Sequence, residues 1–77
     1  MNRSEHVAVV DWMRKTARPA VGQYTRGYVL MDSPSLASVP DGLRVGSVLG
    51  IDLRRDASLA DNKYSYRNAA GTVLASN

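Results

Sequence analysis

The sequence predicts an α+β fold that is mainly β, with an N-terminal helix followed by a small antiparallel sheet or a partly closed barrel. Three observations predict it: apolar residues at helical spacing near the N-terminus, a period-two alternation over 43–53, and a tyrosine-containing hairpin near the C-terminus. The 77 residues suffice for a single domain, 1–77. We divide it into a helical N-terminal segment, 2–18, and a β-rich body, 21–77.

The first segment has the signals of a helix start and a helix end. Asn2 is a suitable N-cap, and Glu5 stands three residues later, which is the spacing of a capping box. Basic residues gather before Pro19, where they complement the helix dipole and where proline ends the helix. Apolar residues recur at helical intervals: Val7, Val10, Met13 and Ala17. The rival interpretation is a strand, because three of the residues 7–10 are β-branched valines.

The segment 21–31 favours a strand, since it ends in tyrosine and aliphatic residues before Asp32 and Pro34. Residues 32–42 are rich in Ser, Pro, Asp and Gly and predict a loop. The loop closes on the turn sequence 40–42, in which proline fixes φ and glycine accepts a left-handed backbone.

The segment 43–53 has the clearest periodicity in the chain. Its odd positions are apolar except Ser47, and its even positions are polar or glycine except Val48, which predicts one long strand with one buried face. The residues expected to be buried are Leu43, Val45, Leu49, Ile51 and Leu53. Those expected to be exposed are Arg44, Asp52 and Arg54, with Gly46 and Gly50 on the same outward face.

The last segment predicts a hairpin. Residues 64–67 and 72–75 are strand-like, and the four residues between them begin with Asn68 and end with Gly71, as a four-residue turn prefers.

The residue types needed for most catalysis and metal binding are missing or badly placed. The chain has no cysteine, and its one histidine, His6, stands in the first turn of the predicted helix. A disulfide is therefore excluded, and a structural zinc site lacks ligands. The carboxylates of Asp52, Asp56 and Asp61 do not follow calcium-loop spacing. We expect a protein that is not an enzyme, with no catalytic, cofactor-binding or metal site and no small-molecule substrate.

The longest uninterrupted apolar run is four residues, 7–10, and charges occur throughout the first twenty residues. The sequence thus predicts neither a membrane span nor a signal peptide. We expect a protein of the cytoplasm or of an assembled virion.

A chain this short gains little stability from one core, so we expect a protein partner or self-assembly. The candidate partner-binding residues are Val7, Val10, Trp12 and Met13, because tryptophan is a favoured interface anchor. The alternative is that Trp12 docks the helix onto the sheet of its own chain.

Nucleic-acid binding is the alternative function. The net charge is +3, and tyrosine alternates with arginine or serine in two predicted strands. Small β-rich domains use aromatic and arginine side chains on a sheet to stack bases. The candidate residues are Tyr24, Arg26, Tyr28, Tyr64 and Tyr66. The competing interpretation places these tyrosines in a core that contains no phenylalanine.

The segment 43–50, Leu-Arg-Val-Gly-Ser-Val-Leu-Gly, is followed by Lys-Tyr-Ser-Tyr at 63–66 and Gly-Thr-Val-Leu-Ala at 71–75. Over 43–77 this order resembles the head decoration (capsid cement) proteins of tailed bacteriophages. The resemblance implies a non-enzymatic structural protein that clusters on a capsid lattice, with its N-terminal segment reaching neighbouring capsid subunits. A small virally encoded inhibitor of a host protein is a further alternative.

Overall fold

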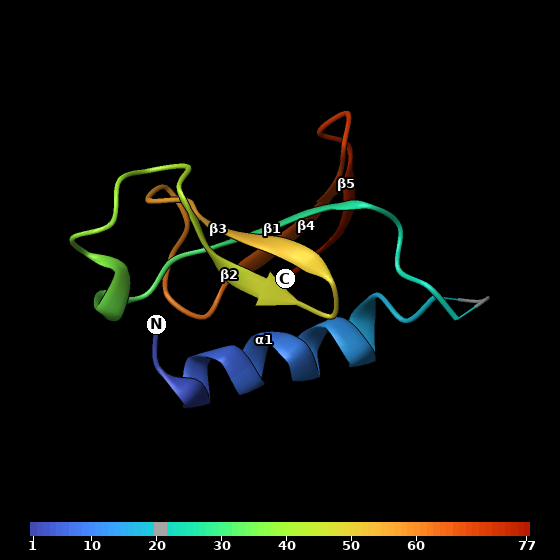
Figure 1. The fold of residues 1–77 in the computed structure, drawn as a ribbon, viewed down its shortest axis with the longest axis horizontal. Helices are drawn as coiled ribbons and strands as arrows, with labels where there is room; N and C mark the ends of the chain where they lie inside the picture. Colours follow the sequence, from blue (N-terminus) through green and yellow to red (C-terminus); the bar gives the residue numbers. More distant parts are fainter. Residues whose placement is uncertain (20–21) are drawn as a thin grey trace.

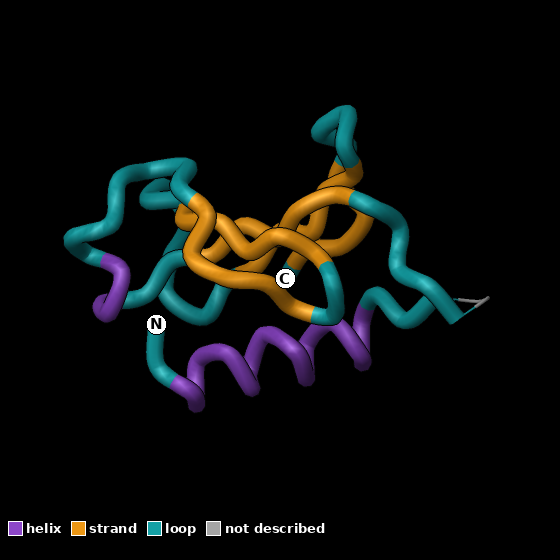
Figure 2. Tube along the Cα trace, viewed as in Figure 1, coloured by secondary structure: helices purple, strands orange, loops and turns teal. Residues whose placement is uncertain are grey.

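The computed structural model describes residues 1–19 and 22–77, and it contains one α-helix that packs on a five-stranded mixed sheet (Figures 1 and 2). The elements are α1 (Arg3–Thr16), β1 (Gly27–Met31), the short 3-10 helix η1 (Pro34–Leu36), β2 (Arg44–Val48), β3 (Ile51–Arg55), β4 (Tyr64–Asn68) and β5 (Val73–Ser76). The predicted fold class is confirmed, but the sheet is open and does not close into a barrel. Val21, the first residue of the predicted β-rich body, lies outside the described residues.

Helix α1 begins with the predicted capping box. The Asn2 side chain accepts a hydrogen bond from the Glu5 N–H at 2.9 Å, and the Glu5 carboxylate accepts one from the Asn2 N–H at 3.1 Å. The three valines of 7–10 do not divert this segment into a strand, because Val9 gains complete burial in the helix. Among the described residues, no helix has the length and apolar character needed to cross a bilayer.

The order of strands in the sheet is β2-β3-β1-β4-β5, and β1 runs parallel to β3 while the other pairs are antiparallel. The prediction of a wholly antiparallel sheet is therefore wrong. The connection from β1 to β3 runs through η1 and β2, and it is longer than the roughly dozen residues that a parallel crossover needs. Strand β2 then forms a hairpin with β3 and occupies the edge of the sheet.

The single long strand predicted over 43–53 is also wrong, because this segment folds into the β2–β3 hairpin. The chain reverses at Leu49 and Gly50, which both have positive φ, 52° and 79°. Two successive positive φ values are what a two-residue hairpin turn of type I′ requires. A leucine is an uncommon residue in that conformation, since its Cβ crowds the backbone.

The predicted burial pattern holds for the apolar residues of β3 and fails for β2. Ile51 and Leu53 are buried as expected, at 4% and 0% exposure. In contrast, Leu43 is 52% exposed and Val48 is buried, because the turn and a register shift between Arg44 and Gly46 reset the alternation. In this hairpin Val45, Leu49, Asp52 and Arg54 are half-buried, and Arg44 is exposed.

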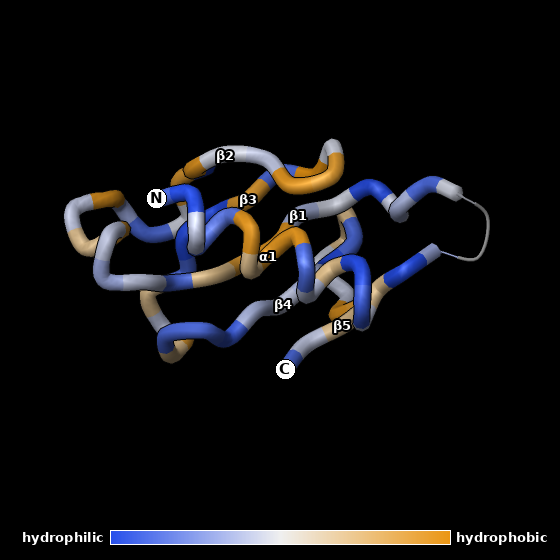
Figure 3. The backbone as a smooth tube through the Cα atoms, turned by 90° about the horizontal axis from the view of Figure 1, so that it is seen from below, coloured by the Kyte–Doolittle hydropathy of each residue, from blue (hydrophilic) through white to orange (hydrophobic). Residues whose placement is uncertain are grey.

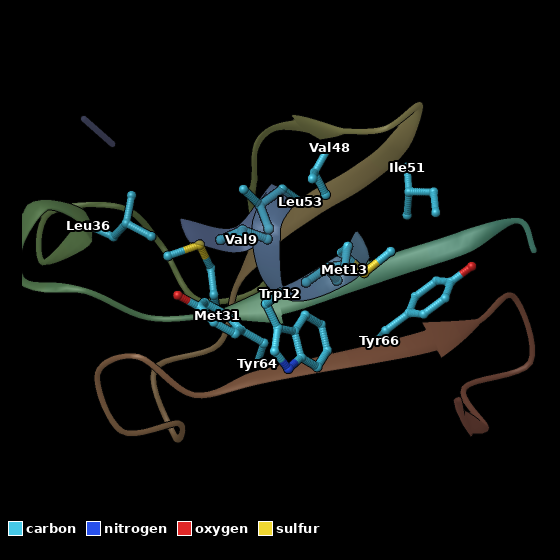
Figure 4. Close-up of a cluster of buried hydrophobic side chains, with 11 residues drawn as sticks. Val9, Trp12, Met13, Met31, Leu36, Val48, Ile51, Leu53, Tyr64 and Tyr66 are labelled. Carbon is cyan, nitrogen blue, oxygen red and sulfur yellow. The ribbon is translucent and has the colours of Figure 1, made fainter. Parts of the chain in front are cut away.

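The core lies between α1 and one face of the sheet (Figures 3 and 4). From the helix, Trp12 packs against Tyr64 of β4 with ring centroids 5.1 Å apart and planes inclined at 44°. Leu36 of η1, only 1% exposed, closes one end of the core. The buried apolar residues are Val9, Trp12, Met13, Val29, Met31, Leu36, Val48, Ile51, Leu53, Tyr64 and Tyr66.

The connection 32–42 is held to the end of β3 by a largely buried ion pair. The Arg55 Nε lies 3.0 Å from the Asp32 Oδ1, and the two side chains are only 15% and 14% exposed. The same guanidinium donates to the carbonyl oxygens of Val39 at 2.5 Å and Ala37 at 3.4 Å. The hydrogen bond from Arg55 lowers the pKa of Asp32 below its ordinary value, although burial opposes this.

The contact between Trp12 and Tyr64 predicts a large stability loss in the variant Trp12→Ala. Removing a buried tryptophan leaves a cavity and should lower the free energy of unfolding by about 3–5 kcal/mol, measured by urea denaturation. The control Val7→Ala truncates a side chain that is 54% exposed on the same helix, and it should change stability by about 0.5 kcal/mol or less. Equal effects of the two changes would contradict this packing.

The Asp32–Arg55 pair predicts an acid-sensitive contribution to stability. Because the folded-state pKa of Asp32 is lowered, the stabilisation is complete above its unfolded-state pKa and is lost as the pH falls through the folded-state pKa. Asp32→Asn should therefore lower the melting temperature at neutral pH, and this difference should shrink below about pH 4. Asp61→Asn, at an exposed position, is the control and should change the melting temperature little. A pH-independent effect of Asp32→Asn would refute the ionic contribution.

Candidate functional site

The sheet face opposite α1 carries most of the polar chemistry of the strands. Successive residues of a strand point to opposite faces, so Val29 enters the core and Tyr28 points away from α1. The register places Asp52 of β3 on one side of Tyr28 and Arg67 of β4 on the other. The next outward row contains Arg54, opposite Leu30. We call this surface the outer face.

A shallow hollow of about 400 Å³ opens on the outer face. Three of its residues lack long side chains, and the absence of a side chain at Gly27 is required, because a Cβ there would lie 1.9 Å from the Arg67 carbonyl oxygen. The two neighbours of Gly27 in the sequence, Arg26 and Tyr28, line the hollow with a positive charge and an aromatic ring. The lining residues are Arg26, Gly27, Tyr28, Gly50, Asp52, Arg54 and Ala69.

The hollow is held by a small electrostatic network. The Arg54 guanidinium carbon lies 4.7 Å from the centroid of the Tyr28 ring, within the range of a cation–π interaction. Asp52 lies between two arginines, 3.0 Å from the Arg44 Nε and 3.6 Å from the Arg54 Nη2. The Asp52 carboxylate thus faces two guanidinium groups, those of Arg44 and Arg54. Because Arg67 lies on the other side of Tyr28, the outer face keeps a net positive charge.

The alternation predicts that Tyr24 and Tyr28 lie on one strand. Tyr24 instead precedes that strand, because β1 begins only at Gly27. It instead lines a second hollow, of about 260 Å³, together with Arg14 and Arg18 from the C-terminal end of the helical segment. The Tyr24 hydroxyl donates to the Met13 carbonyl oxygen at 3.5 Å. Arg26, two residues later, lines the first hollow, so the segment 24–26 joins the two basic hollows.

Tyr64 and Tyr66 belong to the core, and their prediction as base-stacking residues is wrong. They are 7% and 3% exposed because β4 turns these side chains toward α1. The Tyr66 hydroxyl donates to the Thr25 carbonyl oxygen. Burial raises the pKa of both tyrosines above the ordinary value. The interpretation of these two residues as substitutes for phenylalanine agrees with their positions.

The predicted partner-binding residues of α1 also divide between the core and the surface. Trp12 is 9% exposed and Met13 is fully buried, because both pack on the sheet of their own chain. Val10 is half-buried and packs against the same core, and Val7 is exposed. The side chains of Trp12 and Met13 are therefore unavailable to a partner in this fold, and Trp12 docks the helix onto the sheet.

His6 makes a structural contact. Its Nε2 lies 2.7 Å from the carbonyl oxygen of Ser47, so the imidazole links α1 to β2. Within the described ranges 1–19 and 22–77, no three His, Cys, Asp or Glu side chains gather as metal ligands.

The sequence pattern missed Arg54 and Asp52 as members of the site. Asp52 stands in the predicted strand 43–53 and Arg54 directly follows it, and both are expected only to be exposed on the outward face. Their alternation was a usable signal, but only the register between β1 and β3 brings them beside Tyr28.

Comparisons with known proteins found no matching family model, curated protein or solved structure.

Proposed function

We propose that this chain is a non-enzymatic binding protein whose outer face binds single-stranded nucleic acid. The observation that supports it best is the Tyr28 ring beneath the Arg54 guanidinium, on a sheet face that no helix covers (Figure 1). A base needs an accessible aromatic surface for stacking, and the neighbouring phosphates need cations. The hollow supplies both within one small area.

The charges of the outer face suit a flexible polyanion. Arg26 and Arg54 line the hollow, and Arg67 adjoins Tyr28 in the register. Guanidinium groups bind phosphate through paired donors and also stack on planar rings. The small residues Gly27 and Ala69 leave room beside Tyr28 for a base to approach.

The second hollow extends the same chemistry. Arg14, Arg18 and Tyr24 repeat the combination of two arginines and one tyrosine, and the segment 24–26 links this group to the first hollow. An extended strand that contacts both hollows would meet an aromatic ring in each. This arrangement favours a single strand, whose unpaired bases are free to stack, over a rigid duplex.

Assembly on a protein lattice is the second candidate function. Two of the four side chains first expected to form its contact surface, Trp12 and Met13, are buried in the core. One specific observation still favours assembly, namely the exposed apolar side chains of Val73 and Leu74 on the edge strand β5. The resemblance to capsid decoration proteins, and the role of an inhibitor of a host protein, stay predictions.

Titration with single-stranded oligonucleotides tests the proposed function. If about three phosphates are neutralised, raising the salt from about 50 mM to about 200 mM should weaken binding roughly twentyfold. Tyr28→Ala should cost about 1–3 kcal/mol of binding free energy through lost stacking, and Arg54→Ala should both weaken binding and reduce the salt dependence. Fluorescence anisotropy of a labelled oligonucleotide measures both effects.

Arg3→Ala is the matched control, because it removes one arginine from the exposed start of α1. Its binding should stay near that of the unchanged protein. Undetectable binding at low salt would contradict the proposal, as would equal losses in Arg3→Ala and Arg54→Ala, which would indicate a nonspecific charge effect. Each variant is first checked for an unchanged circular dichroism spectrum.

A further inference from the structure

Asp52 is the acidic residue of a hollow that otherwise carries positive charge. It supplies the one carboxylate among the described residues that line the hollow, and a carboxylate repels phosphate. Part of its role is structural, since it lies 3.0 Å from the Arg44 Nε and 3.6 Å from the Arg54 Nη2. A carboxylate has about four acceptor positions, of which these two arginines take at most two. Because the Asp52 side chain stays 43% exposed, a ligand in the hollow can reach the others.

The register places Asp52 beside the Tyr28 ring. Tyr28 and Asp52 are direct Cα partners on the parallel strands β1 and β3, and both side chains line the hollow. Neighbouring strands lie about 4.8 Å apart, so a flat base stacked on the Tyr28–Arg54 pair brings one of its edges close to Asp52. The Arg54 guanidinium carbon lies 4.7 Å from the ring centroid. The edge of a stacked base therefore meets a hydrogen-bond acceptor and a hydrogen-bond donor side by side.

Guanine is the base whose edges fit this arrangement best. Its Watson–Crick edge presents two adjacent donors, N1–H and N2–H, and the acceptor O6 stands next to them. The two oxygens of an ionised carboxylate accept such a donor pair, and guanine O6 and N7 are the base atoms that arginine binds most often. Adenine and cytosine offer a carboxylate one amino group beside a ring nitrogen whose lone pair repels it. Thymine and uracil offer one N–H between two carbonyl oxygens.

We propose that Asp52 recognises guanine in a single strand bound to the outer face. The inference rests on the proposed nucleic-acid binding and names the base that the hollow prefers. The Asp52 carboxylate accepts hydrogen bonds from N1–H and N2–H of the guanine, and Arg54 donates to O6. Arg26, which lines the hollow on the other side of Gly27, remains for a phosphate. The negative charge of Asp52 then weakens the binding of every strand, and its hydrogen bonds offset this loss only for strands that contain guanine.

Thymidine strands of about six nucleotides, identical except for one central base, test this preference by fluorescence anisotropy. A strand with one guanine should bind the unchanged protein about fivefold or more tightly than a strand with one adenine or one cytosine, since a good bidentate pair discriminates by at least this factor. Hypoxanthine keeps O6 and N1–H of guanine but lacks the amino group. A strand with one hypoxanthine should therefore bind with an affinity between those of the guanine and adenine strands.

The variant Asp52→Asn separates base recognition from the positioning of Arg54. An amide presents one acceptor and one donor, which match adenine rather than guanine, so the preference for guanine over adenine should fall to about twofold or less. The affinity for the all-thymidine strand should be kept or should rise, because a negative charge is removed. Asp61→Asn removes the same charge at an exposed position outside the hollow, and it should keep the guanine preference of the unchanged protein.

The possible failures of this inference differ from a failure of the proposed function. Salt-sensitive binding with the same affinity for every central base would overturn the guanine preference and leave the proposed function standing. An unchanged preference in Asp52→Asn, or an equal loss of preference in Asp61→Asn, would show that Asp52 does not recognise the base. If Asp52→Asn weakened the binding of all strands equally, Asp52 would only position Arg54. If no strand bound at low salt, the proposed function and this inference would fail together.

Discussion

The packing of α1 against one face of the sheet is the constraint on which the rest of the structure depends. Val9, Trp12 and Met13 form the helical side of the only large apolar contact among the described residues, and within it Trp12 packs against Tyr64. Without this layer a sheet of short strands would expose its apolar face to water. The helix therefore decides which face is core and which face remains open to a ligand.

The alternation of strand side chains then sorts the aromatic residues by role. In a core without phenylalanine, Tyr64 and Tyr66 fill space against the helix, and their burial is the reason that their pKa values rise. Tyr28 has the opposite parity and meets Arg54 on the outer face. Residues of one type thus contribute to stability on β4 and to the candidate binding surface on β1.

Local signals in the sequence predicted the local parts of the fold. The capping box at Asn2 and the Asn68–Gly71 turn both act within a few residues, and both are present. The turn at Leu49 could not be predicted, because a leucine at positive φ is not a turn signal and the alternation continues through it. The parallel pairing of β1 with β3 is non-local, and so is the contact between Tyr28 and Arg54 that it creates. The sequence alone therefore could not show that Asp52 and Arg54 lie beside Tyr28, because only the register of β1 with β3 brings them there.

The central claim is that α1 seals one face of the sheet and leaves the other to bind a ligand. The most direct measurement is an NMR titration of the isotopically labelled protein with a single-stranded oligonucleotide, following each backbone amide. The account predicts shifts that concentrate at residues 26–30 and 52–54 and extend to Arg14, Arg18 and Tyr24 of the second hollow, with the amides of 5–12 unaffected. Shifts that concentrate on residues 5–12 of α1, or no shifts at saturating oligonucleotide, would contradict it.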